Sequence, residues 1–410
     1  MPFQIALSGI GAATADLNVT ANNIANVNTT GFKRSRAEFS DVFAASPYGI
    51  SRNAIGSGVQ VAAVRQQFAR GNIDFTDNSL DMAINGEGFF TLSRAGATVY
   101  SRAGNFGVDK DGYVVNNIGD RLQVFPPTTS ATGVSTGFDL GRLADLQLSR
   151  ADSAPSATTA VTANVNLPAN ATQPTVTPFS PTNSQSYTQS TSLTVYDSLG
   201  VAHTQTMYYV KTATANTWDM YTYIDGTAVG AATNLVYSSS GALTTPAGGT
   251  VTLPAYTPTT GAAPMNITVD LGKSTQYGNT FSVAQLIQDG YATGKLTGID
   301  ISDGGVVTAR YTNGRSTPLG EVALTNFANP QGLQQLGDTS WGETAESGQP
   351  LRGAPNTSSF GAVQGGALES SNVDLTEQLV NMITAQRNFQ ANAQMISTAD
   401  QITQTIINIR

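Results

Sequence analysis

The sequence lacks cysteine and contains a single histidine, His203, among its 410 residues. Without cysteine the chain can form neither disulfide bonds nor thiolate metal sites, which also fits a protein that leaves the cell without oxidative folding. His203 lies within VAHTQTMYY, residues 201–209, where no sequence cue points to a carboxylate or serine partner. This pattern favours a cross-strand surface residue over a catalytic histidine.

Charged residues are scarce as well. They form 12% of the chain, and the net charge at pH 7 is −8. An acidic chain of this kind does not fit nucleic-acid binding. The 41 glycines and the many Thr, Ser, Ala and Asn residues instead indicate short strands and turns with polar, uncharged surfaces. The length allows about two to four domains.

Long hydrophobic runs are missing. No apolar stretch approaches the ~20 residues that a membrane helix needs, so we expect no membrane insertion. Residues 1–24 do not have the pattern of a cleaved signal peptide, because the first lysine is Lys33 and the apolar residues are periodic rather than continuous. If the protein is exported, the general secretory route is therefore not expected.

Motifs for catalysis or cofactor binding are also lacking. The 28 carboxylates are dispersed, and the chain has no His-x-x-x-His, no GxSxG and no Walker loop. Asp109 and Asp111 resemble the start of a calcium loop, but Gly112 comes too early and no glutamate closes the loop, which favours a hairpin. Gly56-Ser57-Gly58 indicates a turn rather than a dinucleotide fingerprint. We expect no enzyme activity, no cofactor and no metal.

What the chain does contain is a pair of helical ends. Residues 372–410 have no Gly or Pro to interrupt a helix; Asn372 or Asp374 can cap its start, and Glu377 and Arg410 suit the helix dipole. Apolar residues with a 4-3 spacing, broken at Gln386 and shifted in phase near the end, form what we call the C-terminal seam. It comprises Leu375, Leu379, Met382, Phe389, Ala393, Ile396, Ile402, Ile406 and Ile409.

The first 28 residues carry a matching stripe, the N-terminal seam. It comprises Phe3, Leu7, Ile10, Leu17, Ala21 and Ile24, with Thr14 as the gap. We interpret the two seams as surfaces between subunits, and we expect both helices to become ordered only when many copies pack together, because backbone ordering costs more than one seam recovers. The alternative is a two-helix hairpin resting on its own globular domain.

The segment around the end of the first helix has a distinct composition, rich in asparagine: TANNIANVNTTGFKRSR, residues 20–36. Its asparagines compete for backbone hydrogen bonds, so the helix should end near Val27. Gly31 allows the positive φ of a turn. The basic group that follows, Lys33, Arg34 and Arg36, is interpreted as a solvated turn.

Two of these segments resemble a known family. ANNIANVNTTGFKRSR, residues 21–36, resembles the N-terminal signature of bacterial flagellar rod and hook proteins, and GALESSNVDLTEQLVNMITAQRNFQANAQMI, residues 366–396, resembles their C-terminal signature. The resemblance marks a signature turn at Asn22, Asn23, Asn26, Gly31, Phe32 and Lys33.

From residue 80 onward the pattern is β. Asp111-Gly112 predicts a type I′ hairpin turn, residues 191–211 predict two strands joined at Asp197–Gly200, and Trp218–Ile224 predicts a strand that meets a turn at Asp225-Gly226. The predicted fold is multidomain α+β, with paired long N- and C-terminal helices of coiled-coil type and two nested all-β domains. The predicted parts are a helical polymerisation domain (1–30 with 372–410), an extended connecting arm (31–75 with 345–371), an inner β domain (76–150 with 290–344) and an outer β domain inserted into it (151–289).

Along the C-terminal helix, Gln386, Gln390 and Gln394 stand at i, i+4 and i+8 and form a neutral amide face. An ordinary solvated helix face more often carries Lys and Glu. We therefore expect these glutamines to line the channel of a tube, where unfolded subunits can pass without electrostatic attraction.

The resemblance implies a structural role. The long insert is similar to the hook branch of the family, whose subunits are exported through the flagellar type III apparatus without a cleaved signal peptide and polymerise under a cap protein. The product would be a curved extracellular tube on the basal-body side of the flagellum, acting as a universal joint between rod and filament. Implied partners are further copies of the chain, the distal rod, the hook cap, the hook-filament junction protein and the export apparatus. A distal rod protein and a secreted β-rich adhesin or binding module remain alternatives, and a hydrolase ranks last.

Overall fold

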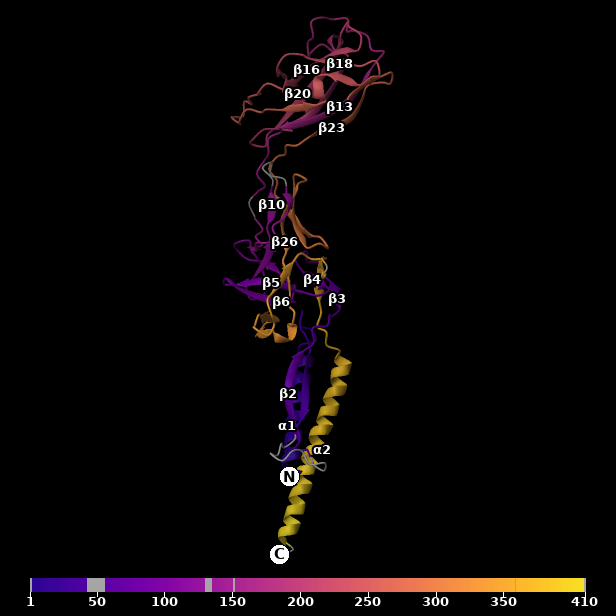
Figure 1. Cartoon of the computed structure of the whole chain (residues 1–410). Helices are drawn as coiled ribbons and strands as arrows, with labels where there is room; N and C mark the ends of the chain where they lie inside the picture. Colours follow the sequence, from indigo (N-terminus) through magenta and orange to yellow (C-terminus); the bar gives the residue numbers. More distant parts are fainter. Residues whose placement is uncertain (1, 43–55, 130–134, 150–151, 358, 409–410) are drawn as a thin grey trace. The chain divides into compact units, whose positions relative to one another are not determined.

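The computed structural model describes residues 2–42, 56–129, 135–149, 152–357 and 359–408. A helix at each end, α1 (Pro2–Ala25) and α2 (Leu375–Asn408), flanks a middle part made almost entirely of β-strands (Figure 1). The predicted α+β fold class is thereby confirmed. Neither helix, over the part of the chain that is described, combines the length and hydrophobicity of a membrane span.

The chain folds into two compact units. Unit 1 comprises residues 1–150, 298–310 and 316–410, and unit 2 comprises residues 151–297 and 311–315. Unit 2 thus takes in residues 290–297 and 311–315 in addition to the insert expected from the sequence. The finer division into four parts remains a prediction.

Helix α1 ends at Ala25, two residues before the expected position. The backbone N–H of Asn26 still donates to the carbonyl oxygens of Asn22 and Asn23, at 3.2 and 3.1 Å, and the chain then turns away. Gly31 has φ +69°, and a Cβ there would lie 2.5 Å from the backbone nitrogen of Ala103. Only glycine therefore fits this turn.

Helix α2 is capped by Asp374, whose Oδ1 accepts from the backbone N–H groups of Thr376 and Glu377 at 2.8 and 3.1 Å. The helix lies antiparallel beside α1: Asn23 near the end of α1 bonds to Gln378 near the start of α2. Fourteen residues back along α1, Gly9 lies against Asn392, which is fourteen residues further along α2. The two chain ends therefore pair lengthwise, as expected.

Beside α1 lies a two-stranded antiparallel ladder. Strand β1 (Ser35–Asp41) pairs with β2 (Val59–Gln66), from Ser35 opposite Gln66 to Asp41 opposite Val59. Both strands contact α1. The short strand β3 (Ile73–Phe75) pairs with β32 (Ala367–Glu369), so the arm that leaves the N-terminal helix meets the arm that leads to the C-terminal one.

The largest sheet joins segments from both sides of the insert. Strand β5 (Phe89–Arg94) pairs with β27 (Leu324–Asn326), and β9 (Arg121–Phe125) pairs with β26 (Ser316–Val322). Strand β6 (Ala97–Ser101) pairs with β29 (Ser340–Gly342). Its main path runs β24 (Leu296–Ile301), β25 (Val306–Tyr311), β26 (Ser316–Val322), β9 (Arg121–Phe125), β5 (Phe89–Arg94), β6 (Ala97–Ser101), β29 (Ser340–Gly342) and β28 (Gln334–Gly337). Beside it lie β7 (Gly107–Val108), β8 (Val114–Val115), β12 (Ala144–Asp145), β27 (Leu324–Asn326) and β30 (Leu351–Gly353). Separate pairs are β4 (Met82–Asn85) with β31 (Ala362–Gly365) and β10 (Pro127–Thr129) with β11 (Ser135–Phe138).

Unit 2 has two sheets around one apolar core that includes Leu167, Met207 and Trp218. One sheet contains β13 (Ala160–Pro168), β20 (Thr250–Thr252), β21 (Thr268–Asp270), β22 (Thr275–Tyr277) and β23 (Ser282–Gln288). The other contains β14 (Gln189–Tyr196), β15 (Ala202–Lys211), β16 (Thr217–Ile224), β17 (Thr227–Ala228), β18 (Thr233–Tyr237) and β19 (Leu243–Thr245). The predicted pair of strands joined at 197–200 is confirmed as β14 and β15.

The two Asp-Gly dipeptides for which turns were expected behave differently. Asp225 and Gly226 both have positive φ, at 50° and 78°, as the two central residues of a type I′ turn require. At the other site only Gly112 has positive φ, so the type I′ turn expected at Asp111-Gly112 is wrong. The reason is the side chain of Asp109, two residues earlier in the chain. Its Oδ1 accepts from the N–H groups of Asp111 and Tyr113, both at 2.8 Å, and these hydrogen bonds determine the turn.

Candidate functional site

The contact between α1 and α2 is made of small and polar residues. The buried positions of α1 fall at heptad intervals and carry little apolar bulk, and those of α2 are equally small or polar. They are Ala6, Ala13, Thr20 and Asn23 on α1, and Gln378 and Ala385 on α2. Gly9 makes room for the side chain of Asn392, because a Cβ at this position would lie 2.5 Å from the side-chain oxygen of Asn392. The fully buried contacts between the helices thus come from small side chains and from the amide hydrogen bond between Asn23 and Gln378.

The two apolar seams are only partly covered within the chain. On α1, Phe3 and Leu7 remain 53% and 54% exposed, Ala21 is exposed, and Ile10, Leu17 and Ile24 are half-buried. On α2, Leu375, Leu379, Phe389, Ala393 and Ile402 are exposed, whereas Met382 and Ile396 are half-buried. Ile409 and the side chain of Ile406 lie outside the described residues. A single copy therefore leaves much of both apolar stripes exposed.

The glutamine face of α2 is also open. Gln386, Gln390 and Gln394 are all exposed. Within the described residues, none of their side chains forms a hydrogen bond. Their neighbours along the same helix are likewise uncharged apart from Arg387. Their position is compatible with a neutral lining, and that role stays a prediction.

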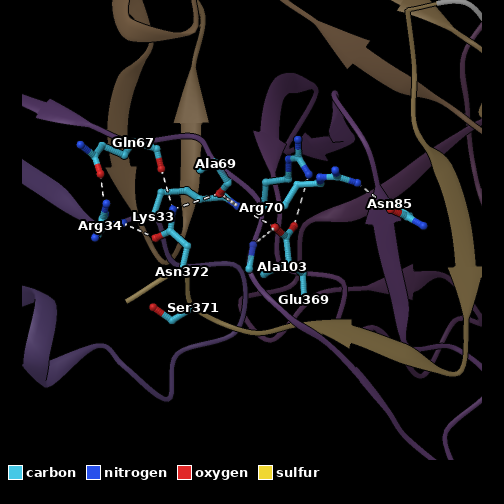
Figure 2. A network of polar contacts seen from close by, with 12 residues as sticks. Lys33, Arg34, Gln67, Ala69, Arg70, Asn85, Ala103, Glu369, Ser371 and Asn372 are labelled. Carbon is cyan, nitrogen blue, oxygen red and sulfur yellow. Dashed lines mark hydrogen bonds and ion pairs between the residues drawn. The ribbon is translucent and has the colours of Figure 1, made fainter. Parts of the chain in front are cut away.

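A buried ion-pair cluster joins the two signature segments, after the end of α1 and before the start of α2 in the sequence (Figure 2). Lys33 Nζ donates to Glu369 Oε1 at 2.6 Å and to the carbonyl oxygen of Ala69 at 2.9 Å. On the other side of the carboxylate, Arg102 Nη1 lies 3.3 Å from Glu369 Oε2. The side chains of Lys33 and Glu369 are 0% and 1% exposed. We call these three residues the junction.

The junction corrects the expectation that Lys33 belongs to a solvated turn. Burial lowers the pKa of Lys33, whereas the charge of Glu369 and its hydrogen bond oppose this shift. Of the other two cations, Arg34 is partly exposed and pairs with Glu377 at 2.8 Å, and Arg36 is exposed and pairs with Glu38. The expectation fails because the partner carboxylate lies 336 residues away in the sequence.

Asparagine side chains continue the connection on both sides of the junction. Asn372 Oδ1 accepts from the backbone N–H of Arg34 at 2.7 Å, and its Nδ2 donates to the carbonyl oxygens of Gln67 and Ala69. Asn23 exchanges two hydrogen bonds with the backbone of Ser35 and donates a third to Gln378. Asn372, offered as a possible helix cap, therefore bridges the arms, and the cap is Asp374.

The remaining signature residues take different positions. Asn22 is exposed, Asn26 is half-buried and donates to the carbonyl oxygen of Asn22, and Phe32 is half-buried. Gly31 is buried, and its N–H donates to the carbonyl oxygen of Glu369 at 2.8 Å. The signature turn is thus bound at its glycine and its lysine to the same glutamate.

His203 in unit 2 is not the surface residue expected from the sequence. It is 6% exposed, its Nδ1 lies 2.6 Å from Asp225, and its Nε2 lies 3.3 Å from Asp197. Burial alone would lower the pKa of His203, but the hydrogen bonds and charges of the two carboxylates outweigh it and raise the pKa. Because each ring nitrogen faces a carboxylate, the protonated imidazolium is the form that this site stabilises.

His203, Asp197 and Asp225 form a hydrogen-bonded structural cluster rather than a reactive one. Asp197 also accepts from Thr260 and from the backbone N–H groups of Leu199 and Val201. The pKa values of Asp197 and Asp225 are both lowered. Burial alone would raise them, but the hydrogen bonds that each carboxylate accepts outweigh the effect of burial. Among the described residues no group of three or more His, Cys, Asp or Glu side chains has the geometry to hold a metal ion.

Family comparisons match most of the chain. The flagella basal body rod protein family matches residues 3–33, and the flagellar hook protein FlgE/F/G D1 domain matches residues 83–178. The flagellar basal body protein FlaE D2 domain matches residues 166–291, and the C-terminal part of the flagellar basal body rod FlgEFG proteins matches residues 364–409.

Full-length relatives carry one name. The flagellar hook protein FlgE of Escherichia coli K12 is 39% identical, and that of Rhizobium meliloti 1021 is 33% identical; the alignments cover 100% of this chain and 100% and 98% of the relatives. A crystal structure of the Helicobacter pylori flagellar hook protein FlgE2 aligns with a TM-score of 0.53 at 15% identity, over 72% of this chain and 100% of that one. The structural likeness supports the fold.

The junction can be tested by removing its charges one at a time. Glu369→Gln leaves Lys33 and Arg102 buried without a counter-charge, and should destabilise unit 1 by about 3–5 kcal/mol. Lys33→Met leaves Arg102 paired with Glu369 and should cost only about 1–3 kcal/mol. Urea unfolding in a Trp218→Phe background, where Trp341 is the one remaining indole and reports on unit 1, measures both. Glu38→Gln, which breaks exposed pairs, is the control; equal costs for all three variants would contradict a buried junction.

The His203 site makes the stability of unit 2 depend on pH. Because the folded pKa is raised, its stabilisation is complete below the usual value of about 6.5 and is lost as the pH rises through the folded value. The unfolding free energy of unit 2 should therefore decrease as the pH rises above about 6.5. His203→Gln should flatten this slope, as measured by Trp218 fluorescence in a Trp341→Phe background. An unchanged slope in the variant would show that another group titrates.

Proposed function

Because this chain belongs to the bacterial flagellar hook protein family, we propose that its exposed helical seams join copies of it into the wall of a hook tube. The chain is a structural subunit of the flagellar hook, a component outside the cell body. The relatives are hook proteins over their full length, which favours this reading over the distal rod protein and over the secreted adhesin or binding module.

The observation that carries the proposal is the direction of the seams. Within one copy, the fully buried positions of α1 and α2 carry small or polar side chains, and large seam residues such as Phe3, Leu7 and Leu379 remain exposed, which leaves them for other copies. Full burial of one such side chain contributes about 1.5–3 kcal/mol, and each copy offers two stripes of them. Repeated contacts between seams can therefore stabilise the inner layer of a helical polymer.

The glutamine face would then line the channel. Gln386, Gln390 and Gln394 are exposed on the same helix as the seam, and they can bond water without attracting a passing chain of either charge. The strand-rich parts would form outer layers with weak, wet contacts that exchange as the curved tube bends, as a universal joint requires.

Further partners follow from the proposed assembly. We infer export through the flagellar type III apparatus without a cleaved signal peptide, growth under the hook cap, and end contacts with the distal rod and the hook-filament junction protein. We propose no catalytic role and no cofactor: His203, the single histidine, is held between two carboxylates in a structural pair.

A charge in the seam tests the assembly directly. Leu379 is 45% exposed on α2, and Leu379→Asp should abolish tube formation because a carboxylate cannot be buried in an apolar contact without a partner. Electron microscopy and sedimentation measure the polymer, and circular dichroism checks that the strand-rich units remain folded. Leu199→Asp, at a 56% exposed leucine of unit 2, is the matched control and should still polymerise. Normal tubes from Leu379→Asp would refute the seam.

The channel face requires a different test. Gln390→Lys with Gln394→Lys adds two charges to an exposed face, so it should leave the unfolding midpoint nearly unchanged and shorten or abolish hooks grown in cells. The matched control, Gln390→Asn with Gln394→Asn, keeps the amides and should grow normally. Hooks of normal length in the lysine variant would count against a channel lining.

A further inference from the structure

The two terminal helices carry very few charges, and two of these have no partner. Asp16 is the one charged residue of α1, and Arg387 is the one cation of α2 between Leu375 and Asn408. Among the described residues neither side chain has a hydrogen bond or an ion pair, whereas Glu377 of α2 is paired with Arg34. Opposite charges left unpaired on nearly neutral helices call for an explanation.

Asp16 lies in a mostly apolar setting. It lines a cavity of about 520 Å³ between α1, α2 and the β1–β2 ladder, with Ile5, Ala12, Phe39 and Val59 among the lining residues. Burial raises the pKa of Asp16, because nothing there stabilises its charge. A cavity with apolar walls and one carboxylate suits a long side chain with an aliphatic stem and a cationic end.

Among the described residues that line this cavity, the same copy offers Asp16 no cation. Asn388, Ala391 and Asn392 of α2 complete the cavity and are neutral. On the other side, Asp16 shares a second cavity, of about 290 Å³, with Arg34 and Arg36. Those two arginines are already paired with Glu377 and Glu38.

Arg387 is not among the residues that line this cavity. Ala385, which faces α1, is fully buried, and two further residues of helix rotate the chain by about 200°. Arg387 is accordingly exposed on the side of α2 away from Ala385. Asp16 and Arg387 thus lie on different faces of one helix pair, and within the described residues they form no ion pair with each other, so both are available to a neighbouring copy.

We propose that Arg387 of one copy enters the cavity beside Asp16 of a neighbouring copy and forms an ion pair there. The inference rests on the proposed self-assembly and specifies its register. Donor and acceptor occupy different faces, so the contact is head-to-tail, and such contacts repeat into open helical assemblies unless the rotation closes a ring. The seams supply non-directional apolar burial, and the ion pair selects one arrangement among those that the seams permit.

Charge reversal tests the pair. In the full-length chain, Asp16→Arg alone places two cations together and Arg387→Asp alone places two carboxylates together. Each should raise the critical concentration for polymerisation by about tenfold or more. The double variant, Asp16→Arg with Arg387→Asp, restores opposite charges and should return the critical concentration to within about threefold of the unaltered chain.

A matched control separates a specific pair from a change in net charge. Arg142 is an exposed arginine of unit 1 outside the helices, and Asp16→Arg with Arg142→Asp has the same net charge as the rescuing double variant. It should polymerise as poorly as Asp16→Arg alone. Rescue by Arg142→Asp, or no rescue by Arg387→Asp, would overturn the pair.

Two further readouts keep the result decisive. Circular dichroism of each monomer shows whether a variant folds. The variant Asp16→Asn removes the charge with little change in shape. It should weaken polymerisation and make polymerisation less sensitive to salt. Undiminished salt sensitivity in Asp16→Asn would refute the pair. If the unaltered chain forms no polymer at all, it is the proposed self-assembly that fails, whereas polymer from the unaltered chain without charge-swap rescue refutes the ion pair alone.

Discussion

The contact between α1 and α2 is the constraint on which the rest of the structure depends. Asn23 bonds to Gln378 across the contact, and Gly9 makes room for the side chain of Asn392. The fully buried residues of the contact are small or polar, and the large seam residues that are described are at most half-buried. In the proposed assembly, each copy therefore keeps apolar surface to bury against its neighbours.

The junction ties this helix pair to the strands of unit 1. Glu369 lies between Lys33 and Arg102, and its backbone carbonyl accepts from Gly31, so a single residue binds the signature turn through both main chain and side chain. Buried charges are costly unless they are paired, and this cost enforces one geometry.

The relatives and the geometry agree on the type of protein while addressing different questions. Identity of 39% and 33% over complete relatives places the chain in its family. The exposed seams, the neutral glutamine face and the unpaired Asp16 and Arg387 bear on the proposed contacts between copies, which a family name does not specify. The low charge of the helices makes the two unpaired residues informative, because a surface crowded with lysine and glutamate would hide them.

The sequence by itself determined the helical ends, the apolar stripes along them, several strands and the family, because these depend on local periodicity, on turn residues and on two signature segments. Its expectations failed for Lys33, for His203 and for the turn at Asp111-Gly112. In the first two cases the partner lies far along the chain or across a hairpin, at Glu369 and at Asp225, and no local pattern indicates such a contact. At Asp111 a cap from Asp109 overrides the dipeptide preference. Which residues of each helix become fully buried was likewise decided only by the tertiary structure, which buries small residues such as Ala13 and Ala385 and leaves seam residues such as Leu7 and Leu379 exposed.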